Sequence, residues 1–266
     1  MGRRTLLNFV GALVLCAAAA SGAAAQDFQK SYELGAGGSV EIANVSGDVN
    51  LFGYDGSAVV VSAYKEGRDR DIVEVVDEST QGQVKLHVEY PRDCRNCNAS
   101  VRFEVRVPRS GNISFDKIST ASGNVKAEGF SGRLHLSTAS GNVTVRGVGG
   151  EIRASSASGN VRVNDATGTV NASTASGDVL VELTRVDGAG DMRFSSASGD
   201  VRVRMPSNID ARVSLSTASG DIETNFPLEV KQDPYNNSKR AEGQLGSGAR
   251  LLKISSASGN VSFKSM

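Results

Sequence analysis

Apolar and polar residues alternate in short runs through the second half of the chain. In residues 141–158, GNVTVRGVGGEIRASSAS, the side chains of Val143, Val145 and Ile152 would point to one side, and those of Thr144 and Arg153 to the other. This period of two, broken by glycines, predicts two short strands joined by turns in each such segment. The pattern excludes an amphipathic helix, because apolar residues at i and i+2 do not form one helical stripe.

The same segment recurs as a repeat with the consensus S-[ST]-A-S-G-[DN]-[VI]. Its first four glycines, Gly123, Gly141, Gly159 and Gly177, are 18 residues apart, and the later steps are longer. A unit of two short strands cannot bury its apolar edge alone, but stacked units bury it in a continuous core. We therefore expect an all-β fold, a β-solenoid or β-roll of stacked repeats of about 18 residues. The seven copies lie at residues 118–125, 136–143, 154–161, 172–179, 194–201, 215–222 and 254–261, with a degenerate copy at 44–49.

Stacking the repeats in sequence order predicts rows of like side chains along the axis, about 4.8 Å apart. In this register Val163 points inward between Val145 and Val181, whereas its neighbour Arg162 points to solvent. One inward row holds Val125, Val143, Val161, Val179, Val201, Ile222 and Val261, and the row of the facing strand holds Leu134, Ile152, Val170, Met192, Val213 and Leu252.

The section before the repeats has longer runs of strand-forming residues. Examples are Val59 to Tyr64, Val84 to Tyr90 and Val101 to Val107, separated by polar turns. A solenoid has open edges at its ends, and a cap is the usual protection for them. We therefore expect residues 26–110 to form an N-terminal β section that is continuous with the repeat solenoid of residues 111–266 and caps it.

The first 25 residues have the pattern of a signal peptide. Arg3 and Arg4 precede an apolar run from Leu6 to Val14, and Ala23-Ala24-Ala25 offers a cleavage site before Gln26. Lipid attachment at Cys16 is a less favoured alternative, because the residues before it are bulky. The apolar run is short for a membrane span and no second candidate follows. We expect a periplasmic, cell-surface or secreted protein without a transmembrane segment in the mature chain.

Charge and composition limit the function further. The chain has 29 basic and 29 acidic residues, and removal of Arg3 and Arg4 with the leader leaves a net charge of −2. No electrostatic attraction to nucleic acid is therefore expected. Polysaccharide lyases and hydrolases with β-helices need clustered carboxylates and often aromatic platforms. This chain has no Trp and few aromatic residues in the repeats, so we expect a protein that is not an enzyme.

Two cysteines remain after the leader, Cys94 and Cys97, in the segment YPRDCRNCNAS. In an oxidising compartment a structural disulfide is the favoured interpretation. We expect it to staple the tip of a hairpin between the strand-like runs 84–90 and 101–107. Free or redox-active thiols and a metal site remain alternatives, although only His87 and His135 could add nitrogen ligands.

The Asn or Asp after each motif glycine has two interpretations. Most of these residues suit a turn in which glycine takes a positive φ and the side chain bonds to the local backbone. Asp178, Asp200 and Asp221, however, would occupy the same position in three successive rungs, where their carboxylates would repel one another. A bound Ca²⁺, the only cofactor that the sequence suggests, would relieve the repulsion. Neighbouring arginines or solvation are the alternative.

Three further patterns concern the surface. The outward arginines could form a basic stripe that meets anionic glycans or lipid headgroups, although a solvated charged face is the common case. A row of Ser and Thr could suggest ice binding if it faced outward. The longer repeats place their extra residues at the corner opposite the motif turn, as either a binding face or tolerated loops. The arginines are Arg146, Arg153, Arg162, Arg193, Arg202 and Arg204, the hydroxyl row includes Thr120, Thr138, Ser156 and Thr174, and the insertions are residues 184–191, 205–210 and 227–248.

The serial S-G-[DN]-[VI] turns, the VRVP of residues 105–108 and the closing GSGARLLKISSASGNVSF of residues 246–263 resemble a bacterial putative-adhesin domain family of unknown function. That family is a β-solenoid related to the toastrack domains of envelope proteins. The resemblance covers nearly all of the chain after the leader, and it implies an extracytoplasmic solenoid with no catalytic residues to transfer.

Together these patterns predict an exported, non-catalytic, adhesin-like binding module of the cell envelope. Its partner would be a surface glycan, a lipid headgroup or an envelope protein. The alternative is a structural or stress-response envelope scaffold that contacts protein partners, and a polysaccharide-active enzyme is less favoured.

Overall fold

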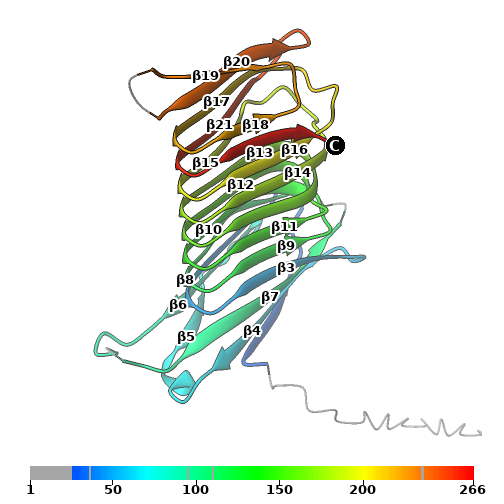
Figure 1. Ribbon diagram of the computed structural model, residues 1–266. Helices are drawn as coiled ribbons and strands as arrows, with labels where there is room; N and C mark the ends of the chain where they lie inside the picture. Colours follow the sequence, from blue (N-terminus) through cyan, green and yellow to red (C-terminus); the bar gives the residue numbers. More distant parts are fainter. Residues whose placement is uncertain (1–25, 36, 95, 110, 235–236) are drawn as a thin grey trace, which may run out of the picture.

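The computed structural model describes residues 26–266, except residues 36, 95, 110 and 235–236. The described residues form 22 strands in one sheet that winds around a single core, with one 3-10 turn, η1 (Arg70–Ile72) (Figure 1). The expected all-β solenoid is confirmed. The signal peptide expected in residues 1–25, together with Cys16, lies outside the described residues. Within the described part of the chain, no helix has the length and apolarity to span a membrane.

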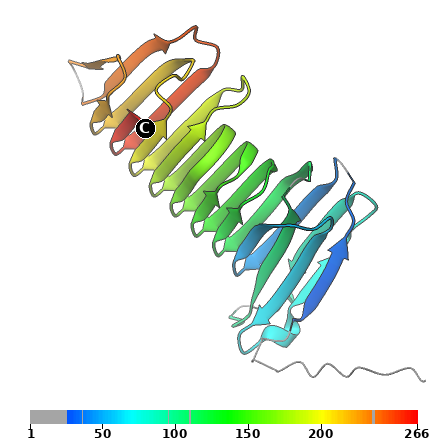
Figure 2. The ribbon, with the colours of Figure 1, turned by 90° about the vertical axis from the view of Figure 1, so that its right-hand side faces the viewer.

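Each rung of the solenoid contributes one strand to each of two layers, and the tight motif turns line up along one edge (Figure 2). We call the first layer the serine layer, because its outward positions carry a row of serines. In spatial order it contains β2 (Ser39–Ser46), β8 (Ile113–Ser122), β10 (Gly132–Ser140), β12 (Gly149–Ser158), the second half of β13 (Val161–Ser176), β15 (Met192–Ser198), β21 (Leu251–Ser258) and β17 (Ala211–Ser219).

The second layer is called the valine layer, after its inward rows. In spatial order it contains β3 (Val49–Tyr54), β9 (Val125–Glu128), β11 (Val143–Arg146), the first part of β13, β14 (Val179–Arg185), β16 (Val201–Met205), β22 (Val261–Ser265) and β18 (Ile222–Thr224). All pairs within these two series are parallel, as expected for a solenoid.

The expected inward register is confirmed through the central repeats. Val143 lies opposite Val125 on one side and Val161 on the other, and all three side chains are fully buried. Val163 is also fully buried, whereas Arg162 is exposed. The core between the layers is one or two side chains deep, and its largest members are phenylalanines such as Phe115, Phe194 and Phe263.

The rungs do not stack in sequence order at the C-terminal end, so the expected order of the last two repeats is wrong. Met192 pairs with Leu252, and Leu252 pairs in turn with Val213. The rung of residues 251–265 therefore lies between those of residues 192–205 and 211–224, and in Figure 1 the red β22 lies between β16 and β18.

The longest insertion explains this change of order. Its strands β19 (Glu229–Gln232) and β20 (Lys239–Leu245) form a hairpin, and β20 pairs antiparallel with β17. Because β20 occupies the outer edge of β17, the returning chain enters on the inner side, between β15 and β17. The segment 227–248 is thus neither a loose surface loop nor a corner loop like residues 184–191 and 205–210. It closes the end of the stack, where Phe226 stacks on Phe263 with ring centroids 4.3 Å apart.

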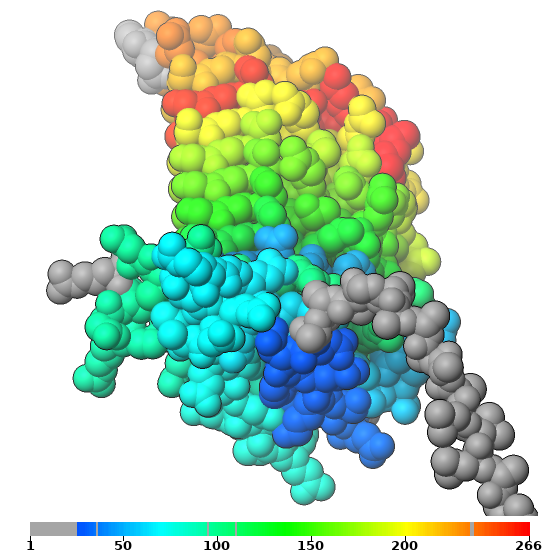
Figure 3. All heavy atoms as spheres, turned by 90° about the horizontal axis from the view of Figure 1, so that it is seen from below, coloured from blue at the N-terminus to red at the C-terminus, as the bar shows by residue number. Residues whose placement is uncertain are grey.

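At the N-terminal end, too, one rung lies between two others out of sequence order, and antiparallel strands close the stack. Here β1 (Phe28–Tyr32), β4 (Val59–Glu66), β5 (Glu74–Asp77), β6 (Gln83–Glu89) and β7 (Ser100–Pro108) form the outer strands. β2 and β3 lie between the rung of β6 and β7 and the rung of β8 and β9. Antiparallel β5, β4 and β1 cover the outer side, and Figure 3 shows these blue and cyan residues in front of the green and yellow layers of the repeats.

The hairpin expected between residues 84–90 and 101–107 is wrong. β6 pairs with β2 and β5, whereas β7 pairs with β3 and β4, so the two strands belong to different layers. The segment that holds Cys94 and Cys97 therefore connects the two layers of the outermost rung.

Candidate functional site

The turns that contain the motif glycines have a backbone conformation and a close spacing that exclude other residues. The glycines of the repeat have φ between 138° and 151°, as in Gly159 with 150°. A Cβ atom on Gly159 would lie 2.0 Å from the carbonyl oxygen of Gly141, in the preceding rung. Only glycine therefore allows neighbouring turns to approach at the spacing of the strands.

An inner row of hydroxyl groups ties each turn to the next. Ser156 Oγ donates a hydrogen bond to the carbonyl oxygen of Gly141 at 2.8 Å, and Ser196 does the same to Gly177. The row is buried, with exposures of 2–6%, so it presents no surface for ice. Its other members are Thr120, Thr138, Thr174, Ser256 and Thr217, which donate to Gly47, Gly123, Gly159, Gly199 and Gly259, respectively.

An outer row of Asn and Asp residues forms a second ladder. The Oδ1 atom of each residue accepts the backbone N–H of its counterpart in the next rung, at 2.7–2.9 Å. In spatial order the ladder runs through Asp48, Asn124, Asn142, Asn160, Asp178, Asp200, Asn260 and Asp221. These side chains hold the backbone of the turns.

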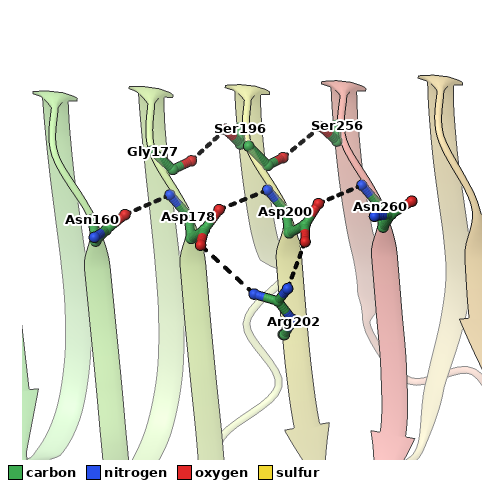
Figure 4. A network of polar contacts seen from close by, with 9 residues as sticks. Asn160, Gly177, Asp178, Ser196, Asp200, Arg202, Ser256 and Asn260 are labelled. Carbon is green, nitrogen blue, oxygen red and sulfur yellow. Dashed lines mark hydrogen bonds and ion pairs between the residues drawn. The ribbon is translucent and has the colours of Figure 1, made fainter.

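The three aspartates considered for calcium do not occupy successive rungs. Asp178 and Asp200 are neighbours, and Asn260 follows Asp200 (Figure 4). Asn260 therefore separates Asp200 from Asp221. That part of the expectation is wrong because the inserted rung supplies Asn260. Among the described residues, no group of three or more His, Cys, Asp or Glu side chains could hold a metal ion.

Basic side chains neutralise these carboxylates instead. Arg202 Nη2 lies 2.5 Å from Asp200 Oδ2, and its Nη1 lies 3.7 Å from Asp178 Oδ2 (Figure 4). Asp221 pairs with Lys239 of β20. The sequence allowed arginine as an alternative to calcium, but it did not reveal Arg202 as the bridging residue. It also could not indicate Lys239, which reaches Asp221 from the closing hairpin.

Cys94 and Cys97 form a disulfide with a Cα–Cα distance of 5.5 Å. The expected pairing is present, in a connection between layers. The neighbouring carbonyl of Pro91 accepts the N–H of Cys94 at 3.0 Å, and Tyr90 donates its hydroxyl to the carbonyl of Ala99 at 2.9 Å. The disulfide thus lies in a locally hydrogen-bonded connection and is part of the N-terminal closure.

A partly buried cluster in the N-terminal strands keeps one carboxylate charged. Asp77 Oδ2 lies 2.6 Å from Lys30 Nζ and 3.0 Å from the Tyr32 hydroxyl, and Asp77 Oδ1 accepts the N–H of Ser79 at 2.9 Å. Partial burial acts to raise the pKa of Asp77, but the hydrogen bonds from Lys30, Ser79 and Tyr32 outweigh it and hold the pKa well below its usual range. Burial raises the pKa of Tyr32. The cluster joins β1 to β5 and is structural.

The outward arginines do not form one stripe. Arg146, Arg162, Arg202 and Arg204 lie on the valine layer, whereas Arg153 and Arg193 lie on the serine layer.

On the valine layer, several acidic and basic side chains around one depression form ion pairs. Around a shallow depression of about 640 Å³, Arg204 pairs with Glu182 at 3.4 Å and Lys264 pairs with Glu223 at 2.7 Å. The ladder aspartates beside it are paired too.

The serine layer differs, because two cations that form no ion pair among the described residues lie directly opposite each other on its neighbouring strands. One outward position lies directly before a buried apolar residue in each strand, as His135 does before Leu136. At this position successive strands carry Lys117, His135, Arg153, Asn171, Arg193 and Lys253. We call this set the basic row. Within the described part of the chain, Lys117, Arg193 and Lys253 form no ion pair, and Arg153 pairs with Glu151 at 2.9 Å. The serine layer therefore has the surface that is best suited to a ligand.

The family Toastrack DUF4097 matches residues 39–264. No curated protein matches the chain. Similar solved structures include a "putative cell adhesion protein" from Clostridium sporogenes, with 12% identity, a TM-score of 0.39, and coverage of 90% of this chain and 99% of that one.

A "putative adhesin" from Bacteroides fragilis has 15% identity and a TM-score of 0.36, and the match covers 90% of this chain and 96% of that one. A "putative adhesin" from Parabacteroides distasonis has 11% identity and a TM-score of 0.39, with 88% and 96% coverage. The family match runs from β2 into β22 and includes every rung, so this chain belongs to the Toastrack DUF4097 family.

Proposed function

We propose that this protein is an exported, non-catalytic binding module of the cell envelope. The observation that carries the proposal is the basic row, in which Lys117, Arg193 and Lys253 form no ion pair among the described residues and Arg193 lies directly opposite Lys253. Like charges on neighbouring strands repel one another, and an oppositely charged partner would relieve that repulsion. Export rests on the leader pattern of residues 1–25, which is compatible with the disulfide.

The polar residues of the repeats support a role without catalysis. The ladder carboxylates accept backbone N–H groups, and the inner hydroxyls donate to backbone carbonyls. A general base or nucleophile must be free to exchange a proton with a substrate. The repeated side chains already have structural hydrogen bonds, and the hydroxyl row is buried.

A second candidate function is an envelope scaffold that contacts protein partners. One observation favours it: β19 forms an outer edge whose four residues are all exposed, with hydrogen bonding to β20 on one side. Exposed edges can add a strand from another protein. The charges of Glu229 and Lys231 on this edge act against such pairing, so we rank the scaffold second.

Two measurements test the proposal. Fractionation of native cells, with N-terminal sequencing of the protein, is expected to find it outside the cytoplasm and beginning at Gln26. Retention in the cytoplasm with Met1 intact would contradict export. Residues 26–266 are then incubated with isolated cell envelopes and with envelopes from which proteins have been removed by protease. The binding module retains binding to the protease-treated envelopes, whereas the scaffold loses it.

A further inference from the structure

We propose that the basic row binds a linear acidic polysaccharide, laid along the solenoid axis across the serine layer. This inference rests on the proposed function and names the class of ligand for it. The ligand would be a single polymer chain that carries carboxylates at intervals and hydroxyl groups between them.

From His135 to Lys253 the basic row is straight, because the register of these strands is regular. Between β8 and β10 the register shifts beside His135. His135 lies opposite Arg153, and Arg153 lies opposite Asn171. Asn171 Oδ1 accepts the backbone N–H of Arg193 at 3.0 Å, and Arg193 lies opposite Lys253. Five steps between neighbouring strands, from β8 to β21, give the row a length of about 24 Å. A row of this length and direction matches an extended polymer chain.

The inserted rung contributes directly to the row. Lys253 lies beside Arg193 because β21 enters between β15 and β17. If the rungs stacked in sequence order, the neighbour of Arg193 would be Ser214 of β17. The departure from sequence order therefore places two cations in neighbouring strands, about 5 Å apart. Neither has an acidic partner among the residues that the structure describes.

A shallow trough follows the row on the serine side. Two hollows, of about 270 and 690 Å³, both include Ser173 and Ser195 in their lining. The first hollow also has Arg153, Asn171 and Arg193 along its wall. In the described structure, the hydroxyls of Ser155, Ser173 and Ser195 make no hydrogen bond within the protein. They are free to pair with the hydroxyl groups of a sugar, while the cations pair with its carboxylates.

The surface is less suited to other anionic partners. A membrane would favour clustered exposed apolar anchors. Among the described residues, the large exposed apolar side chains of the serine layer are Val45 and Leu251, which lie far apart in the stack, on β2 and β21. Single-stranded nucleic acid would favour aromatic platforms for its bases, and the outward positions that flank Arg153 and Arg193 carry no aromatic residue but Glu151, Ser155, Asp191 and Ser195.

The test measures binding of residues 26–266 to polygalacturonate, with dextran as the neutral polymer, phosphatidylglycerol vesicles as the membrane probe and poly(dT) as the nucleic-acid probe. The double variant Arg193→Gln/Lys253→Gln removes two neighbouring cations of the row. Its matched control is Arg146→Gln/Arg162→Gln, which removes two exposed cations without ion pairs from neighbouring strands of the valine layer. Both double variants change only exposed or half-buried side chains, and circular dichroism checks that they fold alike.

We expect the unmodified chain to bind polygalacturonate with an affinity that falls as salt rises. The row variant is expected to lose about tenfold in affinity, and the control less than about twofold. Equal losses in the two variants would overturn the assignment to the serine layer. Binding to vesicles or poly(dT) in preference to polygalacturonate would overturn the choice of ligand while leaving a binding module. Failure to bind any probe or the native envelope would overturn the proposed function itself.

Discussion

Asn260 donates its backbone N–H to Asp200 Oδ1 at 2.8 Å, across 60 residues of sequence. In the central rungs the same ladder joins residues 18 or 22 apart. One turn geometry therefore serves both for neighbours in sequence and for a rung that returns from a distant part of the chain.

Truncation of the returning rung is expected to unfold the C-terminal end. Ending the chain at Gly248 removes Leu252, Ile254, Val261 and Phe263, which are all fully buried. At about 1.5–3 kcal/mol for each buried side chain, the loss is comparable with the whole stability of an ordinary domain. Urea denaturation followed by circular dichroism measures it.

The control for the truncation removes Gly188–Gly190 from an exposed corner loop and is expected to change the midpoint little. An unchanged midpoint in the truncated chain would mean that β17 pairs directly with β15 and that the returning rung is dispensable.

The substitution Val163→Asp is expected to destabilise the protein by several kcal/mol, because it buries an uncompensated charge between two rungs. Arg162→Asp, one residue earlier on the exposed face, should cost under about 0.5 kcal/mol. Denaturant midpoints of the two variants provide the comparison. Similar losses, or a larger loss for Arg162→Asp, would show that the two faces of this strand are assigned the wrong way round.

The substitution Thr174→Val tests the inner hydroxyl ladder. Valine has nearly the same shape but cannot donate a hydrogen bond to the Gly159 carbonyl, which now accepts from Thr174 Oγ1 at 2.8 Å. Leaving a buried acceptor without its donor costs about 1–3 kcal/mol. The outward neighbour Ser173→Val is the control and should cost much less. Equal effects on thermal unfolding would show that the hydrogen bond of the ladder is not the source of the cost.

Stability is expected to depend on pH through Asp77. The folded protein holds the pKa of Asp77 below its unfolded value of about 4. Its contribution is therefore fully present above that unfolded value and is lost as the pH falls toward the folded one. Asp77→Asn should be less stable than the unmodified chain at pH 7, and the difference should shrink between about pH 5 and pH 2. A constant difference across this range would show that Asp77 does not act through its charge.

The sequence was sufficient to predict the rungs and their inward rows. The period of two assigned Val143 and Val163 to the core, and the spacing of the glycines assigned the turns. It was not sufficient for the order of the rungs, because all motif turns are nearly alike and each could stack on any other. The order depends on the pairing of β20 with β17, and nothing in the local pattern of residues 239–245 indicates that partner.

The candidate site was harder to predict for the same reason. The spacing placed Asp178, Asp200 and Asp221 in one row, but the returning rung put Asn260 between two of them. Arg193 could be recognised as an outward cation, yet its proximity to Lys253 follows only from the altered order. The relation between residues far apart in sequence is what a repeat pattern leaves undetermined.

The inserted rungs also set a sequence of events for a chain made from its N-terminus. When residues 211–224 become available for folding, the slot beside β15 and β16 is still unfilled, because residues 251–265 follow them in the chain. At that moment β17 can pair with β15, whose sequence is nearly identical to that of its final partner β21. The final arrangement therefore requires either that β17 waits or that an early pairing of β15 with β17 reopens. This end is therefore completed only after residues 251–265 have joined, unlike the rung-by-rung growth of the middle of the stack.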